Sequence, residues 1–240
     1  MRPTQLLMVV ALLSGCLPRV GIHRVGDQHN SRCAELLTAG ALSEARAECT
    51  LALAFNPDSP NALVNLGLIE YREGNAQAAR KLWIQAARTD NENAQAYNNL
   101  GVLALADGEP RLAESRFERA LQVNPEYLEA RKGLALSQVR LHKFDEAELT
   151  LRTMIALAPL LSEPYHDLGT LRLQRGDAKD AAHWFEKAVQ LEIGYAEAWK
   201  GLALAREQLG DAHAAREAFE SCVEAAPGDL ECGRGLRRTR

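Results

Sequence analysis

The sequence lacks the residue patterns that catalysis, nucleotide binding or metal binding require. Its six histidines are scattered, and none stands in a His-Glu-x-x-His arrangement or at a metal-ligand spacing. It has no glycine-rich phosphate-binding loop, and its lysines and arginines form no basic stripe of the kind that binds nucleic acid. The many acidic residues are typical of solvated helix surfaces. We therefore expect neither an enzyme nor a nucleic-acid-binding protein, and no cofactor or metal.

The N-terminus lacks an apolar run long enough to span a bilayer. The run from Leu6 to Leu13 has the length of a signal-peptide core, and Arg2 precedes it. It ends in Leu13-Ser14-Gly15-Cys16, which resembles a bacterial lipobox, in which the cysteine is lipidated and the preceding peptide is removed. We expect a signal peptide at 1–15, lipidation at Cys16 and a lipidated tether at 16–25. The alternative is an uncleaved N-terminal anchor or a chance cysteine.

One alanine period runs through most of the remaining chain. Alanine recurs at intervals of 34 residues, and each alanine is preceded five residues earlier by glycine or, once, by His142. A glycine there lets the chain leave one helix and turn into the next. Small residues stand twelve positions before each alanine and mostly large ones four after it, so two helices can pack closely. The period indicates an array of helix pairs. The alanines and the units they define are Ala45, Ala79, Ala113, Ala147, Ala181 and Ala215 in 26–59, 60–93, 94–127, 128–161, 162–195 and 196–229.

This pattern resembles the tetratricopeptide repeat. The segments Ala94–Asn99 and Ala196–Trp199, with Leu100 and Gly101, stand at its signature positions. The resemblance implies an all-α fold, a right-handed superhelical solenoid of six helix pairs with a concave inner face. Residues 230–240 are expected to form a short C-terminal cap helix. Its arginines are more typical of a soluble cap than of an anion site, which is the alternative.

Four cysteines remain besides Cys16, an even number that suits an oxidising compartment. Cys33 and Cys49 occupy facing positions on the two helices of the first unit. Cys222 lies on the last helix of the sixth unit, and Cys232 lies on the cap helix expected to pack against it. We predict the disulfides Cys33–Cys49 and Cys222–Cys232. Buried free thiols are the alternative.

Two sets of first-helix positions one turn apart predict an apolar floor on the concave face. The alternative is that some of these side chains pack against neighbouring helices. Leu136 and Leu204 stand where a carboxylate-binding member of the family would place asparagine, so a carboxylate clamp is not expected. An amphipathic helix or a strand with one apolar face suits such a floor. The predicted groove residues are Leu68, Tyr71, Val102, Leu105, Leu136, Val139, Leu173 and Leu204.

The layout of lipobox, short tether and six repeats resembles the pilotins of type IV pili, of the Tgl, PilF and PilW kind. The resemblance implies a monomeric, periplasm-facing lipoprotein of the outer membrane. It would bind secretin subunits and promote their insertion and oligomerisation for pilus assembly and pilus-dependent motility. Residue 17 is leucine and not the aspartate that retains many such lipoproteins in the inner membrane. An adaptor for β-barrel assembly or for cell-wall hydrolases is the alternative.

Overall fold

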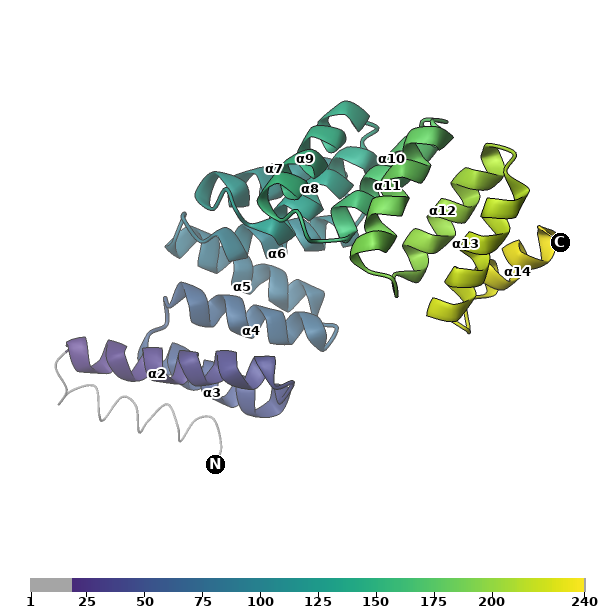
Figure 1. Ribbon diagram of the computed structural model, residues 1–240. Coiled ribbons are helices and arrows are strands. Elements are labelled where there is room, and N and C mark those ends of the chain that lie inside the picture. The colour runs from purple at the N-terminus through teal and green to yellow at the C-terminus, as the bar shows by residue number, and fades with distance from the viewer. Residues whose placement is uncertain (1–18, 240) are drawn as a thin grey trace. The chain divides into compact units, whose positions relative to one another are not determined.

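The structure, a computed structural model, describes residues 19–239, which contain thirteen helices and no strand (Figure 1). The predicted fold class is confirmed: twelve helices form six pairs, and a shorter helix follows them. The described chain forms two compact units, divided between Ala130 and Arg131. The signal peptide and Cys16 lie outside the described residues.

The first unit contains three helix pairs and the start of α8 (Leu128–Arg140). In each pair the two helices pack on one another, and the second helix of a pair packs on the first helix of the next. The six helices are α2 (Arg19–Thr38), α3 (Leu42–Phe55), α4 (Pro60–Arg72), α5 (Ala76–Thr89), α6 (Ala94–Ala106) and α7 (Pro110–Val123).

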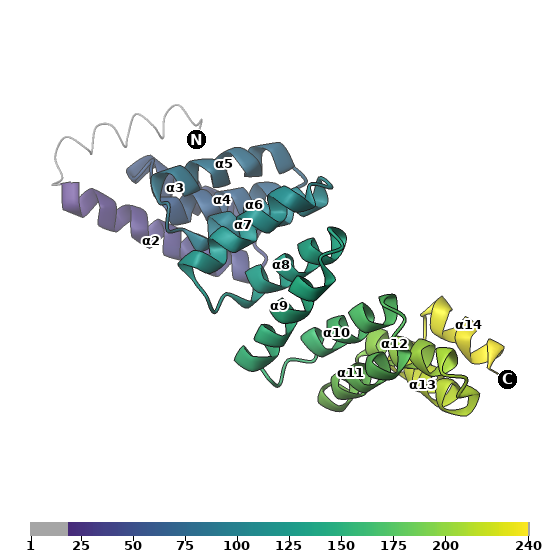
Figure 2. The ribbon, with the colours of Figure 1, turned by 90° about the horizontal axis from the view of Figure 1, so that it is seen from above.

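The second unit contains the rest of α8 and six further helices, and it repeats the same order of packing. At its C-terminal end α14 packs against α13 and α12, as both ribbon views show (Figures 1 and 2). The helices are α9 (Phe144–Leu157), α10 (Glu163–Gln174), α11 (Ala178–Leu191), α12 (Ala196–Gln208), α13 (Ala212–Ala225) and α14 (Leu230–Arg238).

The first helix begins earlier than the period predicts. α2 starts at Arg19, so the stretch up to residue 25, predicted as part of a tether, belongs to a helix. These seven residues add about two turns to the helix. At Gly26, α2 passes close to α3: a Cβ atom added to this glycine would lie 3.3 Å from the Ala52 carbonyl oxygen.

Small and large residues meet inside the repeats, as the sequence pattern requires. A Cβ atom on Gly101 would lie 2.7 Å from the ring of Phe117, and one on Gly169 would lie 2.8 Å from the ring of Phe185. Gly67 meets Trp83 in the same way. The absent side chain therefore lets the first helix of a pair approach the aromatic ring of the second, which is buried.

Each of the six helix pairs turns through a residue with left-handed backbone, and five of these residues are glycines. His142 is the exception, with φ of 59° between α8 and α9. Residues other than glycine are disfavoured at positive φ because their Cβ atom crowds the following carbonyl oxygen. The His142 ring lies edge-on to Phe144, with 5.7 Å between centroids, so a side-chain contact offsets part of that strain.

Each end of the array carries a disulfide. Cys33 on α2 is joined to Cys49 on α3, and Cys222 on α13 is joined to Cys232 on α14. The Cα–Cα separations are 5.3 and 5.8 Å, within the usual range for disulfides. These are the pairings that the sequence predicts, and all four residues are fully buried. Cys33 and Cys49 stand at the positions where the second repeat has Gly67 and Trp83, so the first repeat has a covalent link in place of a glycine–aromatic contact.

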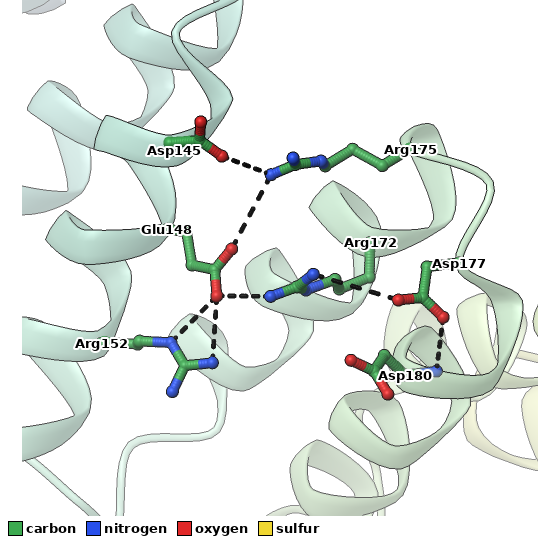
Figure 3. A network of polar contacts seen from close by, with 7 residues as sticks. All are labelled: Asp145, Glu148, Arg152, Arg172, Arg175, Asp177 and Asp180. Atoms are coloured by element: carbon green, nitrogen blue, oxygen red, sulfur yellow. Dashed lines mark hydrogen bonds and ion pairs between the residues drawn. The ribbon is translucent and has the colours of Figure 1, made fainter.

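An ion-pair network joins α9 to the pair α10–α11 (Figure 3). Glu148 of α9 accepts hydrogen bonds from Arg152 of its own helix and from Arg172 of α10. Arg175 reaches Asp145 at 2.7 Å and also lies 3.9 Å from Glu148. The Glu148 side chain is only 16% exposed, and three arginines compensate its charge at this partly buried interface between helices.

Candidate partner-binding site

A cavity of about 400 Å³ opens on the second unit. It lies between the first helices of two successive pairs, α8 and α10, and one residue of the α11–α12 loop completes its wall. The side chains that line it are Lys132, Ala135, Leu136, Val139, Leu151, Glu163, His166, Asp167, Thr170, Leu171, Gln174 and Tyr195.

The floor of this cavity is apolar. Leu136 and Val139 of α8 lie one turn apart on one helical face, and Leu136 is 43% exposed. Behind them Leu151 and Leu171 are each 1% exposed and belong to the buried core of the unit. A rigid core therefore supports a surface that stays open to an apolar side chain of a partner.

The wall of the cavity is polar and mostly negative. Lys132 of α8 forms an ion pair with Glu163 at the start of α10. The Nδ1 atom of His166 lies 3.0 Å from a carboxylate oxygen of Asp167. The His166 ring also lies 5.1 Å from the ring of Tyr195, centroid to centroid. Charged groups, an imidazole and a phenol thus converge on one side of an apolar floor.

Tyr195 precedes α12 as its N-cap residue and is half-buried. Burial raises the pKa of its hydroxyl well above the ordinary value, and nearby carboxylates raise that pKa further. These carboxylates are Asp167, Glu163, Glu197 and Glu192. Of these four carboxylates, Asp167 and Glu163 line the cavity together with Tyr195.

A second, smaller cavity of about 260 Å³ lies beside α12 and α14 and includes Leu204, which is 37% exposed. Its charged groups are largely engaged with one another. Lys200 lies 3.1 Å from Glu231, and Arg238 donates to Glu207 at 2.6 Å. Arg238 is thus held by a carboxylate.

The eight predicted groove residues fall into two groups. The position directly after the small residue is open at Val102, Leu136 and Leu204, each 37–43% exposed. At the position three residues on, Leu105 is only 8% exposed and Leu173 packs against the core of the second unit.

The remaining predicted residues also pack inward. Tyr71 lies 5.8 Å from the Trp83 ring, centroid to centroid, and Leu68 packs against the core of the first repeat. Val139 lines the cavity while packing against the core behind it. Side chains one turn farther along the first helix are directed between helices, so they do not form a second open row. That these residues bind a partner stays a prediction.

The structure adds site residues that the apolar pattern does not reveal, namely Lys132, Glu163, His166, Asp167, Gln174 and Tyr195. A comparison at the repeat period would have flagged Asp167, because the equivalent positions hold Asn65, Asn99, Gly133 and Gly201. Tyr195 could not be found in this way, since its place in the wall depends on how the α11–α12 loop folds.

Within residues 19–239 the structure groups no three histidine, cysteine or acidic side chains in a way that could hold a metal ion. None of the helices in this part of the chain is long and apolar enough to cross a membrane.

Sequence models of the tetratricopeptide repeat match residues 58–126, 104–170 and 166–229, and together they span most of the chain. With six helix pairs in the same register, the chain is a tetratricopeptide-repeat protein.

Within this class it is related to the type IV pilus assembly proteins PilF and PilW. PilF of Pseudomonas aeruginosa is 28% identical over 139 residues, which cover 56% of this chain and 54% of that protein. The human protein O-mannosyl-transferase TMTC3 is 27% identical over 153 residues, 61% of this chain and 16% of that protein. The chain thus spans about half, or less, of the length of the curated relatives it matches.

Two solved structures have the same fold. The structure of Pseudomonas aeruginosa PilF superimposes with a TM-score of 0.79 at 19% identity, covering 91% of this chain and 99% of that one. PilW, described as a widely conserved type IV pilus biogenesis factor, also gives 0.79, at 22% identity and with 88% and 98% covered.

Proposed function

We propose that this chain acts in type IV pilus biogenesis as a pilotin. In this role it is a lipoprotein of the outer membrane that faces the periplasm, binds secretin subunits and promotes their insertion and oligomerisation. The observation that carries the proposal is the similarity to PilF in sequence together with the similarity to PilF and PilW in fold. The lipobox-like segment ending at Cys16 supports the membrane location.

In this proposal the lipid anchor and the cavity have separate roles. The lipid on Cys16 tethers the protein to the membrane, since several acyl chains anchor far more firmly than one. The cavity between α8 and α10 holds a membrane-destined segment of the secretin monomer, whose apolar side chains meet Leu136 and Val139. Oligomerisation of the secretin then buries that segment and releases the pilotin.

Deletion of the gene tests the role directly. We expect the deletion strain to lose heat-resistant secretin multimers on gels and to lose surface pili, and the parent gene to restore both. Restoration by a Cys16→Ser variant should fail or be weak, because the unlipidated protein is not held at the membrane. Normal secretin multimers in the deletion strain would rule out the pilotin role.

A substitution in the cavity tests where the partner binds. Leu136→Glu places a charge on the open apolar floor, whereas a glutamate at Leu105 would mainly report on folding, because Leu105 is 8% exposed. We expect Leu136→Glu to keep its helical circular dichroism and to lose capture of the secretin. The matched control is Leu149→Glu on α9, where the leucine is 69% exposed and outside the cavity. Equal loss in both variants would remove the cavity from the mechanism.

A further inference from the structure

The cavity between α8 and α10 is more acidic than the equivalent surfaces of the other repeats. Asp167 stands where four other repeats have asparagine or glycine, and Glu192 stands where two of its counterparts are Ala158 and Ala226. Asp167 lines the cavity together with Tyr195, and Glu192 lies three residues before Tyr195 in the chain. Asp167 is therefore particular to the fifth repeat, whereas Glu163 recurs as Glu129, Glu197 and Glu231, so it is Asp167 that adds negative charge to this cavity beyond the repeat pattern.

The side chains that line the cavity carry little positive charge to compensate these carboxylates. Lys132 is the only lysine or arginine that lines the cavity, and its ammonium group is already bound to Glu163. Asp167 faces the imidazole of His166, and a carboxylate oxygen of Glu192 accepts a hydrogen bond from the Ser162 hydroxyl at 2.5 Å. Two carboxylates, Glu163 and Asp167, line the cavity against one ammonium group, so the cavity keeps a net negative charge.

Two exposed apolar side chains lie close in the sequence to residues that line this cavity. Leu160, in the loop that leads to Glu163, is 83% exposed, and Ile193, two residues before Tyr195, is 80% exposed. The equivalent loop positions in the first unit include Glu92 and Glu126. Exposed leucine and isoleucine side chains of this kind are typical of a surface that another molecule covers.

We propose that this cavity selects a protein segment in which a lysine or arginine stands beside apolar residues. The inference rests on the proposed function, because it names the chemistry of the segment that the same cavity would hold. An apolar side chain fills the space above Leu136 and Val139. The neighbouring cation lies beside Asp167 and against the rings of His166 and Tyr195.

The opposite ligand class is disfavoured by the same geometry. A segment that ends in a carboxylate, or carries glutamate beside its apolar residues, would bring like charge to Asp167 and Glu192. Lys132 is not available to such a ligand without breaking its pair with Glu163. The cavity therefore discriminates by charge sign as well as by apolar contact.

Fluorescence anisotropy with three labelled short peptides tests the inference on the full chain. The first peptide combines leucine with lysine, the second leucine with glutamate, and the third serine with lysine. We expect the leucine–lysine peptide to bind about tenfold more tightly than either of the others. Equal binding of the leucine–glutamate peptide would overturn the proposal.

A double substitution, Glu163→Gln with Asp167→Asn, removes two wall carboxylates without changing side-chain size. We expect about a tenfold loss of affinity for the leucine–lysine peptide and a smaller difference between the two leucine peptides. The control is Glu118→Gln with Glu126→Gln, which makes the same change in net charge on exposed residues of the first unit. If both double variants bind alike, the attraction is only a general effect of net charge and the proposal is wrong.

The peptide assay and the deletion assay test the ligand class and the pilotin role separately. Normal secretin multimers in the deletion strain, together with the expected peptide preference, would reject the pilotin role and keep the ligand class. Lost multimers, together with equal binding of all peptides, would keep the pilotin role and reject the ligand class.

Discussion

The two units join neighbouring helix pairs at the same positions with opposite charges. In the first unit Arg46 of α3 binds Glu70 of α4, with a nitrogen–oxygen distance of 2.5 Å, and also Glu73. In the second unit Glu148 of α9 receives Arg172 and Arg175 of α10. Each residue of one set lies three repeat periods from its counterpart.

The inversion shows that the repeat fixes where an interaction forms but not its sign. Within each junction the charges are complementary. If α4 were to stack on α9, Glu70 would face Glu148, and the like charges would repel. Opposite signs in the two units therefore favour the native order of helix pairs over other orders that the shared apolar pattern would permit.

The largest expected effect concerns the disulfides at the two ends. Replacing Cys33 and Cys49 with alanine should lower the free energy of unfolding by about 3 kcal/mol, because the unfolded chain regains the freedom of a closed loop. Replacing Cys222 and Cys232 should cost about 0.4 kcal/mol less, since that link spans 10 residues instead of 16. Urea unfolding of the oxidised proteins measures both. Four free thiols in the mass spectrum of the non-reduced protein would contradict the prediction.

The next effect concerns the contact between the helices of a pair. Gly101→Ala should cost about 2 kcal/mol, because the new methyl group would overlap the Phe117 ring. One of the equivalent pairs in the second unit is Ala135 with Leu151, both in its buried core. Adding Phe117→Leu to Gly101→Ala should therefore recover part of the loss. If the double variant loses as much stability as the two single variants together, an alanine–leucine pair cannot replace the glycine–phenylalanine pair at this position.

Reversing one junction should have a moderate effect. Arg46→Glu places three carboxylates together and should lower the free energy of unfolding by about 1 kcal/mol or more. Adding Glu70→Arg and Glu73→Arg gives the first unit the sign pattern of the second and should restore the stability. Urea midpoints of the parent, single and triple variants measure this, and a triple variant no more stable than the single one would count against sign as the relevant variable.

The same junction should contribute to acid sensitivity. The hydrogen bond from Arg46 is the main cause that lowers the pKa of Glu70. The folded pKa lies below the unfolded one, so ionised Glu70 stabilises the fold above the unfolded pKa, and that stability is lost as pH falls through the folded pKa. The stability difference between parent and Glu70→Gln should thus shrink on acidification. Urea midpoints of the two proteins, measured across pH, test this trend.

The smallest effect is expected at the turn between α8 and α9. His142→Gly should raise the free energy of unfolding by about 1 kcal/mol, because glycine adopts positive φ without strain. The lost ring contact with Phe144 reduces the gain. Gly176→Ala, at the equivalent turn of the next pair, should lower stability by a similar amount. Thermal unfolding of the two variants should therefore shift in opposite directions.

The alanine period was enough to predict the helix pairs, because small and large residues at fixed places determine which faces meet. The disulfide partners followed from the same register. The period could not predict that Leu105 is buried while Leu136 is open, since that depends on how successive first helices pack. It also gave no sign that Tyr195 completes the wall of the cavity, because that depends on how the loop before α12 folds.

The Cys33–Cys49 link has a consequence for the order in which the chain acquires structure. Synthesis delivers the first helix pair before any neighbour exists to stack upon it, and a lone repeat buries too little apolar surface to persist. A covalent closure between α2 and α3 makes that pair a lasting template on which later pairs dock as they emerge. We therefore expect slower refolding of the Cys33→Ala, Cys49→Ala chain than of the Cys222→Ala, Cys232→Ala chain, as measured by stopped-flow circular dichroism.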